Sequence, residues 1–267
     1  MILKNQSPES AAVSSFYDEF SKRLLRNYVY GNLRTKAATA RVVSVVTDST
    51  KSILDIGCGI GITADGYVSA APWLRVLGVD ISPRNIEIAK KLFPIEQIDF
   101  CVSDMQVPPQ VCTYDIIALI DVYEHISRND WPKFNLVLRS LLAESGCVVL
   151  TTPTSLHQSY LRKYKPEGLQ IIDETVGLED ICRLADDIGA VLTLYEWMSI
   201  WRTNDYVHVI LTRQPSYQQC MSSSAYAPFL SRVWRHLRGR LQRIHESRIT
   251  RFRKRRVKHE LNVDIED

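Results

Sequence analysis

The sequence predicts an α/β fold in which a mainly parallel, seven-stranded sheet is doubly wound, with helices on both faces. Short apolar runs alternate with helical patterns from about residue 45 to residue 213, and this alternation is typical of parallel sheets. The first apolar run is followed directly by Gly57, Gly59 and Gly61. Such glycines let a buried strand turn sharply into a helix.

Each strand is predicted from a short apolar run that ends at polar or turn residues. The runs lie at residues 52–56, 75–80, 98–104, 114–121, 147–153, 191–197 and 206–213. Helices are predicted after Gly61 and over residues 82–93, 131–146 and 175–190. Ser82 and Pro83 are a capping residue and a first-turn residue for one of them, and Gly146 is expected to end another. Residues 155–173 are expected to form an insertion or lid.

Two further helices are expected before the first strand. Residues 9–30 place Val13, Phe16, Phe20 and Leu24 at helical spacing. A second helix is expected over residues 34–48.

Composition limits the classes of protein that the chain can belong to. Its 267 residues are 45% hydrophobic, which suits one large folded domain, with or without an appendage. It has no apolar run of about 18 residues and no apolar signal core at its N-terminus, so the expected location is the cytoplasm. No two of the six cysteines stand at C-x-x-C spacing, so reduced thiols are expected rather than a zinc site or a redox pair.

The positive charge is concentrated near the C-terminus. Residues 231–258 hold 12 Lys or Arg and one acid, a balance of +11 within a chain of net charge +3. Apolar residues recur there at spacings of three or four, namely Leu230, Val233, Trp234, Leu237, Leu241 and Ile244. This predicts a basic amphipathic helix over residues 229–258. The helix is expected to dock on the acidic body or on a second subunit; an anionic membrane surface and nucleic acid or an acidic carrier are the alternatives.

Acidic residues mark the carboxyl ends of the predicted strands. Asp80, Asp104 and Asp121 end the second, third and fourth strands, and Asp55 stands two residues before Gly57. Ligands of such sheets bind at this edge. The loop reads G-x-G-x-G, with Ile62 where a dinucleotide-binding loop has its third glycine. A carboxylate ahead of the loop disfavours a pyrophosphate and favours a cationic ligand, which leaves a dinucleotide reductase as the second choice.

With these motifs the sequence resembles the class I S-adenosylmethionine-dependent methyltransferases, in particular their small-molecule, type 11/12-like members. The resemblance lies in "LDIGCGIG", "GVDIS", "VSDM", "YDIIALIDVYEHI" and "LLAESGCVVLTTP", and it covers about residues 45–213. It implies a Rossmann-like fold and S-adenosylmethionine as cofactor, with S-adenosylhomocysteine as product. No acid cluster resembles the metal site of catechol-type methyltransferases, so no metal is expected.

The resemblance also implies which residues contact the cofactor. Asp55, Gly57 and Gly59 would hold its methionine part, Asp80 the ribose, and Asp104 with Met105 the adenine. The full implied set is Asp55, Gly57, Cys58, Gly59, Gly61, Asp80, Ile81, Ser103, Asp104, Met105, Asp121 and Val122.

The expected organisation is an N-terminal helical lid (1–44), a cofactor-binding methyltransferase domain (45–213), and a linker with the basic helix (214–267). Tyr17 in the lid is expected to contact the cofactor carboxylate or the acceptor, or else only to cover the edge of the domain. Arg34 is expected to pair with the cofactor carboxylate.

Methyl transfer from a sulfonium is an in-line displacement that depends chiefly on alignment, with removal of a proton from some acceptors. His125 is the preferred base because its ordinary pKa suits neutral pH, and Tyr123 and Glu124 are alternatives; a structural role for the Glu-His pair stays open. The residues expected to bind the acceptor are His157, Tyr160, Trp201, Arg202 and Tyr206.

The predicted function is methyl transfer to an oxygen or nitrogen of a small molecule, as in the tailoring of a natural product or a sugar. An RNA or protein methyltransferase that uses the basic tail is one alternative. A catalytically inactive, cofactor-binding partner subunit is another.

Overall fold

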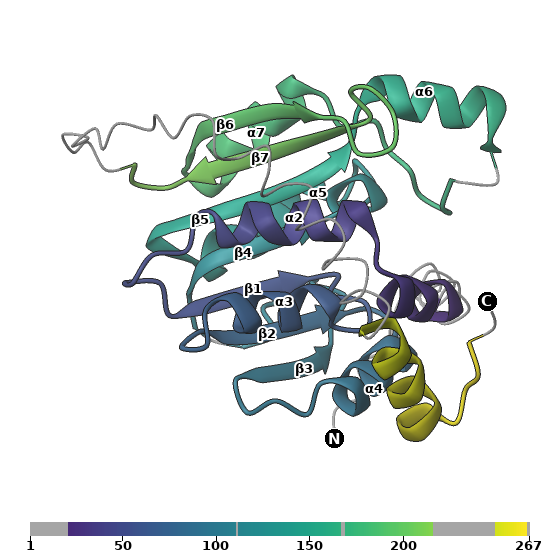
Figure 1. Cartoon of the computed structure of the whole chain (residues 1–267). Coiled ribbons are helices and arrows are strands. Elements are labelled where there is room, and N and C mark those ends of the chain that lie inside the picture. The colour runs from purple at the N-terminus through teal and green to yellow at the C-terminus, as the bar shows by residue number, and fades with distance from the viewer. Residues whose placement is uncertain (1–20, 111, 167–168, 216–248, 266–267) are drawn as a thin grey trace, which may run out of the picture.

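A seven-stranded sheet forms the centre of the computed structural model, which describes residues 21–110, 112–166, 169–215 and 249–265 (Figure 1). The strand order is β3-β2-β1-β4-β5-β7-β6. The strands are β1 (Ser52–Ile56), β2 (Arg75–Asp80), β3 (Ile98–Val102), β4 (Tyr114–Ile120), β5 (Leu142–Pro153), β6 (Val191–Met198) and β7 (Tyr206–Thr212). All pairs among β1 to β5 are parallel, and β7 runs antiparallel to β5 and β6. The predicted Rossmann-like, mainly parallel sheet is confirmed.

Helices cover both faces of the sheet, and the central strands β1, β4 and β5 are accordingly buried on both sides. They are α2 (Leu33–Val43), α3 (Ile62–Ala70), α4 (Pro83–Leu92), η1 (Tyr123–His125, a 3₁₀ turn), α5 (Trp131–Leu141), α6 (Ser155–Tyr164) and α7 (Leu178–Ile188). One core cluster holds side chains of α2, α3 and α4, and a second holds those of α5 and α7. The segment expected as an insertion begins with α6, which projects beyond the sheet in Figure 1.

The direction in which strands are added reverses between β1 and β4, which lie side by side in the middle of the sheet. A reversal point of this kind leaves a crevice at the carboxyl ends of the two strands. The glycine loop after β1 and the turn after β4 therefore meet at one place. The fold thus brings residues 57–61 next to residues 121–125.

The start of β5 corrects the prediction that the preceding helix runs to Gly146. Helix α5 ends at Leu141, and Leu142 is already extended and paired with Tyr114 of β4. Gly146 lies inside the strand, where a Cβ atom would stand 3.0 Å from the carbonyl oxygens of Tyr114 and Asp115. This glycine permits close approach of β4 and does not end the helix.

Two terminal helical segments pack on the same side of the molecule (Figure 1). Residues 21–30 and 249–261 are helical, and Tyr28 and Val257 are both buried in the core cluster that contains α2, α3 and α4. Arg253 donates from Nη1 to the carbonyl of Tyr28 at 3.0 Å, and its guanidinium lies 5.1 Å from the centre of that ring. This part of the basic segment docks on the body of its own chain.

Several predictions concern residues outside the described part of the chain. These are Tyr17, the first half of the N-terminal helix, the linker, and the apolar positions from Leu230 to Ile244. Within the described part, no helix combines the length and apolar character needed to cross a bilayer.

Candidate functional site

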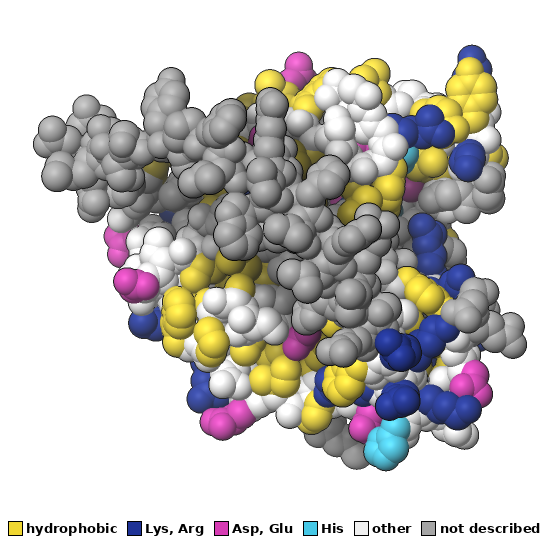
Figure 2. All heavy atoms as spheres, viewed as in Figure 1, with side chains coloured by type: hydrophobic (Ala, Val, Ile, Leu, Met, Phe, Trp, Pro, Cys, Tyr) yellow, Lys and Arg dark blue, Asp and Glu magenta, His cyan; other side chains and the backbone are white. Residues whose placement is uncertain are grey.

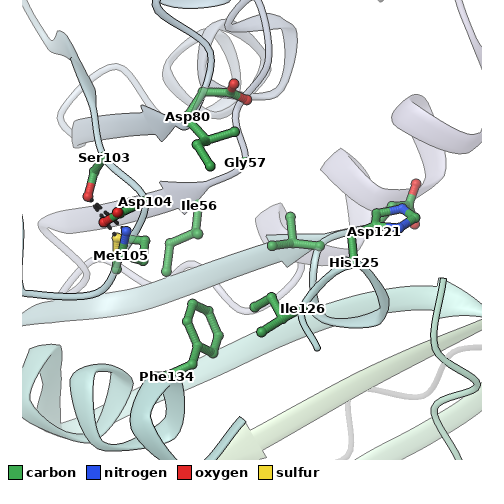
Figure 3. Close-up of a pocket in the computed structure, with 12 residues that line it drawn as sticks. Ile56, Gly57, Asp80, Ser103, Asp104, Met105, Asp121, His125, Ile126 and Phe134 are labelled. Atoms are coloured by element: carbon green, nitrogen blue, oxygen red, sulfur yellow. Dashed lines mark hydrogen bonds between the residues drawn. The ribbon is translucent and has the colours of Figure 1, made fainter. Parts of the chain in front are cut away.

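A cavity of about 160 Å³ opens at the carboxyl ends of the central strands (Figure 3). Most of the predicted cofactor residues line it, together with His125 and three apolar side chains. The lining residues are Ile56, Gly57, Asp80, Ile81, Ser103, Asp104, Met105, Asp121, Val122, His125, Ile126 and Phe134. Most of them follow the ends of β1, β2, β3 and β4, which the sequence had already singled out by their acids, whereas Ile126 follows the 3₁₀ turn and Phe134 belongs to α5.

The glycine loop needs its glycines for geometry as well as for space. Gly57, Gly59 and Gly61 all have positive φ, at 69°, 55° and 85°, a region that other residues adopt only at a cost. A Cβ atom on Gly57 would stand 2.4 Å from Cγ2 of Val122. Gly57 lines the cavity, whereas Cys58, Gly59 and Gly61 shape the loop behind it.

Asp80 ties this loop to the next helix. Its carboxylate accepts hydrogen bonds from the backbone N–H of Gly59 at 2.8 Å and of Ser82 at 2.9 Å, and from the side-chain amide of Asn85 at 3.3 Å. The residue is buried and still lines the cavity. One carboxylate therefore holds both the loop after β1 and the start of α4.

Asp55 does not line the cavity, which corrects the expectation of a carboxylate facing the cofactor. Successive side chains of a strand point to opposite faces, and Ile56 takes the cavity side. The carboxylate of Asp55 instead accepts a hydrogen bond from Thr63 of α3 at 2.6 Å. Burial raises the pKa of Asp55 to about 7, and the nearby Asp80 adds to the shift.

Replacing Asp55 with Asn is expected to flatten the pH dependence of stability. The folded pKa of about 7 exceeds the ordinary 3.8, so the folded chain binds the extra proton and its free energy of unfolding falls as pH rises between these values. The full effect is up to roughly 4 kcal/mol. Urea unfolding at about pH 5 and about pH 8 should show the fall in the wild type and a smaller one in the variant. Asp99→Asn, on the exposed side of β3, should keep the wild-type dependence; an equal fall in both variants contradicts the assignment.

The turn after β3 presents a buried methionine and an exposed acid. Met105 is 3% exposed and has a positive φ of 57°, and its N–H donates to Oγ of Ser103 at 3.1 Å. The carboxylate of Asp104 accepts from the N–H of Gln106 at 3.0 Å. Figure 3 shows this turn on one side of the cavity, with Phe134 and Ile126 on another. The wall here is apolar with an acid at its rim.

Asp121 and Arg34 form an ion pair at the edge of the cavity. Asp121 has a positive φ of 55°, and its carboxylate accepts from Oγ1 of Thr151 at 3.1 Å. Nη1 of Arg34 lies 2.5 Å from Oδ2 of Asp121 and 3.4 Å from the hydroxyl oxygen of Tyr206. Burial opposes the charge of Arg34, but Asp121 outweighs it and raises the arginine pKa. Arg34, expected at the cofactor carboxylate, thus pairs with Asp121 in the structure.

The 3₁₀ turn after β4 points the three candidate bases in different directions. Two of them, Tyr123 and Glu124, do not line the cavity, contrary to the expectation that they act as bases there. Tyr123 is 1% exposed, stacks on Trp131 with ring centres 4.6 Å apart, and donates to Asn135 at 3.3 Å. Glu124 is fully buried outside the cavity lining, with no hydrogen-bond partner for its carboxylate among the described residues, and burial raises its pKa well above the ordinary value. Neither side chain reaches the cavity.

His125 does line the cavity, and the tautomer of its neutral ring follows from one contact. Its Nδ1 lies 2.9 Å from the carbonyl oxygen of Ile172. A carbonyl only accepts hydrogen bonds, so Nδ1 carries the proton and Nε2 is the basic nitrogen. Burial lowers the pKa of His125, which keeps the ring neutral near pH 7.

Comparison with known proteins identifies the family. A family model described as "Methyltransferase domain" matches residues 25–211, which is more than half of the chain. The chain belongs to the class I S-adenosylmethionine-dependent methyltransferases.

Curated relatives of this methyltransferase differ in what they act on. Malonyl-[acyl-carrier protein] O-methyltransferase of Halalkalibacterium halodurans is 28% identical over 64% of this chain and 69% of its own length. Norajmaline N-methyltransferase of Rauvolfia serpentina is 26% identical, over 66% and 70%. The mitochondrial ubiquinone biosynthesis O-methyltransferase of Schizosaccharomyces pombe is 35% identical, but over 39% and 38%. Other curated relatives, too, are matched over only about half of their length.

Solved structures share the fold. Magnesium protoporphyrin IX methyltransferase of Synechocystis, with bound S-adenosylhomocysteine, has a TM-score of 0.60 at 18% identity, covering 76% of this chain and 99% of that one. A methyltransferase in complex with the Trm112 activator of Haloferax volcanii has a TM-score of 0.62 at 13% identity, covering 78% and 100%.

The five residues predicted to bind the methyltransferase's acceptor gather into one aromatic cluster. The ring of Tyr206 lies 5.9 Å from that of Trp201 and 6.0 Å from that of His157. Tyr160 lies 6.4 Å from His157, and its hydroxyl accepts from Arg202 at 3.0 Å. We call these five side chains the aromatic cluster. Arg34 lies between this cluster and the cavity. Its guanidinium lies 6.0 Å from the rings of both Trp201 and Tyr206, and it pairs with Asp121, which lines the cavity.

Sequence reasoning missed the apolar wall of the cavity. Ile56, Ile126 and Phe134 line it, and each reads in the sequence as an ordinary core residue. For Ile56 one signal was available in the sequence: it is the last residue of a strand that leads directly into the glycine loop, a position that often lines a ligand site. In the described part of the chain, no group of three or more His, Cys, Asp or Glu side chains is arranged to hold a metal ion.

Proposed function

We propose that this methyltransferase transfers the methyl group of S-adenosylmethionine to a hydroxyl group of a small molecule. The observation that carries the proposal is the cavity at the β1–β4 reversal point, where Asp80, Asp104 and Asp121 converge on an apolar floor. None of the described residues that line it is Lys or Arg. This charge suits a cationic nucleoside and disfavours a pyrophosphate.

The lining fits the cofactor part by part. Asp80 would accept hydrogen bonds from the ribose hydroxyls, and Met105 with Phe134 would offer the adenine an apolar place beside Asp104. Gly57 would leave room for the methionine chain, and Asp121, whose carboxylate also pairs with Arg34, would lie near the sulfonium. When bound, the cofactor supplies an activated methyl group on a positively charged sulfur.

His125 is the group that removes the acceptor's proton. Its neutral ring with a bare Nε2 can accept a proton from a hydroxyl as attack proceeds. An amine needs no such base before it attacks, and this is why we favour oxygen over nitrogen. The relatives include both O- and N-methyltransferases.

The aromatic cluster is the proposed acceptor site. Stacked and edge-on rings favour a flat, largely apolar molecule and exclude water from the reacting atoms. Arg202 at its border favours a polar or acidic substituent on that molecule. An aromatic natural product with a free hydroxyl matches these features.

A macromolecular acceptor is the second candidate, favoured by the basic C-terminal segment. Deleting that segment is not a clean test, since Val257 is fully buried in the core. Arg251 and Arg255 are exposed, so the double variant R251Q/R255Q lowers the surface charge while keeping the core. A small-molecule enzyme should keep its turnover, whereas an RNA or carrier-bound acceptor should be turned over more slowly and with weaker salt dependence.

Titration calorimetry of the full chain tests the proposal first. S-adenosylmethionine and S-adenosylhomocysteine should bind at one site, and NADH should not. Turnover is then followed with methyl-labelled cofactor against a panel of phenols and aromatic amines of matched shape. NADH binding without uptake of either sulfur compound contradicts the proposal. Cofactor binding without turnover on any acceptor favours an inactive partner subunit.

A further inference from the structure

The segment between α6 and α7 crosses the 3₁₀ turn that carries His125. We call residues 171–175 the strap. Two hydrogen bonds join it to that turn: Nδ1 of His125 donates to the carbonyl of Ile172 at 2.9 Å, and the N–H of Glu174 donates to the carbonyl of Glu124 at 2.7 Å. The strap therefore binds both the imidazole ring of His125 and the backbone of the preceding residue, Glu124.

The strap is itself held by one buried side chain of α6. Gln158 is fully buried, and it is the one residue of α6 that is buried. Its amide Nε2 donates to Oδ1 of Asp173 at 2.8 Å and to the carbonyl of Glu174 at 2.7 Å. One amide group thus fixes the two strap residues that directly follow Ile172.

A second, exposed contact supports the same segment. Arg162, one turn further along α6, donates to the carbonyl of Asp173 at 2.8 Å and to Oγ1 of Thr175 at 2.8 Å. Gln158 and Arg162 both come from α6, the helix that also carries Tyr160 and His157 of the aromatic cluster. Arg128, which follows the 3₁₀ turn, holds the C-terminal end of the strap as well: it donates to the carbonyl of Thr175 at 2.5 Å and pairs with Glu174 at 3.3 Å. The helix of the proposed acceptor site therefore also determines where the Ile172 carbonyl lies.

We propose that Gln158 is a positioning residue for the base. By fixing the strap, it aims the Ile172 carbonyl at Nδ1 of His125, which selects the tautomer that leaves Nε2 without a proton. Without that carbonyl, neutral imidazole distributes its proton between both nitrogens, and only one form can accept the acceptor's proton. This proposal rests on the proposed function of His125 as base.

Other charged groups around His125 do not select a tautomer. Oε1 of Glu124 lies 4.0 Å from Nε2, too far for a hydrogen bond, and burial raises the pKa of Glu124, which disfavours its charged form. Asp121, Asp173 and Arg34 act on the ring through charge alone. Among the described residues, the Ile172 carbonyl is the one hydrogen-bond partner of the ring, so its placement decides the tautomer.

The test is Gln158→Met, which keeps the length of the side chain and removes the amide. Nitrogen-15 NMR of histidine-labelled full chain with S-adenosylhomocysteine reads the tautomer directly, and the His125 signal is assigned by its loss in His125→Gln. The wild type should show the Nδ1–H form, and the variant should show both forms. We expect turnover to fall by roughly tenfold, with affinity for S-adenosylhomocysteine within about twofold of wild type.

Two further variants make the result decisive. Arg162→Met loosens the strap from the exposed side and should shift the tautomer in the same direction, which keeps the test valid if Gln158→Met does not fold. Gln214→Met removes a surface hydrogen bond to Glu144 and should change nothing. A wild-type tautomer in both strap variants, or an equal shift in Gln214→Met, overturns the proposal. Because the tautomer is read without turnover, an inactive wild-type chain would count against the proposed function and leave this result standing.

Discussion

Asp80→Ala is expected to weaken binding of S-adenosylhomocysteine by about 100-fold, the largest effect of any single change at the cofactor site. The carboxylate accepts hydrogen bonds from Gly59, Ser82 and Asn85, so its loss frees the glycine loop and the start of α4 together. Each bond to a charged group contributes about 1.5–3 kcal/mol, and about 2.7 kcal/mol corresponds to 100-fold. The proposed ribose contact is lost as well. Titration calorimetry of the purified variant measures the change.

The matched control for this variant is Asp99→Ala. Asp99 is an exposed acid of β3, the strand next to β2, and it does not line the cavity. Its removal should leave the affinity within about twofold of wild type. An intact affinity in Asp80→Ala, with the fold preserved by circular dichroism, would remove Asp80 from the cofactor site.

His125→Gln is expected to lower turnover by roughly 100-fold or more while leaving cofactor affinity nearly unchanged. Glutamine keeps a donor for the Ile172 carbonyl but has no basic nitrogen. Burial lowers the pKa of His125, so the wild type should hold its rate somewhat below pH 6.5 and lose it as the ring is protonated at lower pH. The variant's residual rate should lack this acid limb. The measurement is a pH profile of turnover on the acceptor found in the panel.

His259→Gln provides the comparison, because His259 is exposed on the C-terminal helix. It should keep both the rate and the acid limb. A loss of less than about threefold in His125→Gln, with cofactor affinity intact, would show that the acceptor needs no base from this residue. The proposal for Gln158 would then have no base to position.

Local pattern predicted most of the fold. The apolar runs at residues 52–56 and 75–80 became β1 and β2 with the expected bounds, because a buried parallel strand is a short apolar stretch that turn residues close. The glycine loop could also be predicted, since positive φ at Gly57, Gly59 and Gly61 favours that residue type. The boundary between α5 and β5 near Gly146 could not be predicted in this way. A glycine that ends a helix and a glycine that lets two strands approach look alike in sequence.

The direction of side chains was decided only by packing. Strands buried on both faces carry apolar residues on both, so nothing local to "LDIG" indicates that Ile56 faces the cavity and Asp55 faces Thr63. The same holds for "DVYEH", where a single 3₁₀ turn sends Tyr123 and Glu124 into the core and His125 to the cavity.

By itself, then, the sequence determined the strand-and-helix alternation, the glycine loop and the row of acids at strand ends, because each depends on neighbouring residues and on backbone geometry. Only the tertiary structure decided that Arg34 pairs with Asp121, that the aromatic cluster assembles beside them, and that Gln158 reaches the strap. These contacts join segments far apart in the chain, and their distances follow from how helices and strands pack, which no local pattern of residues records.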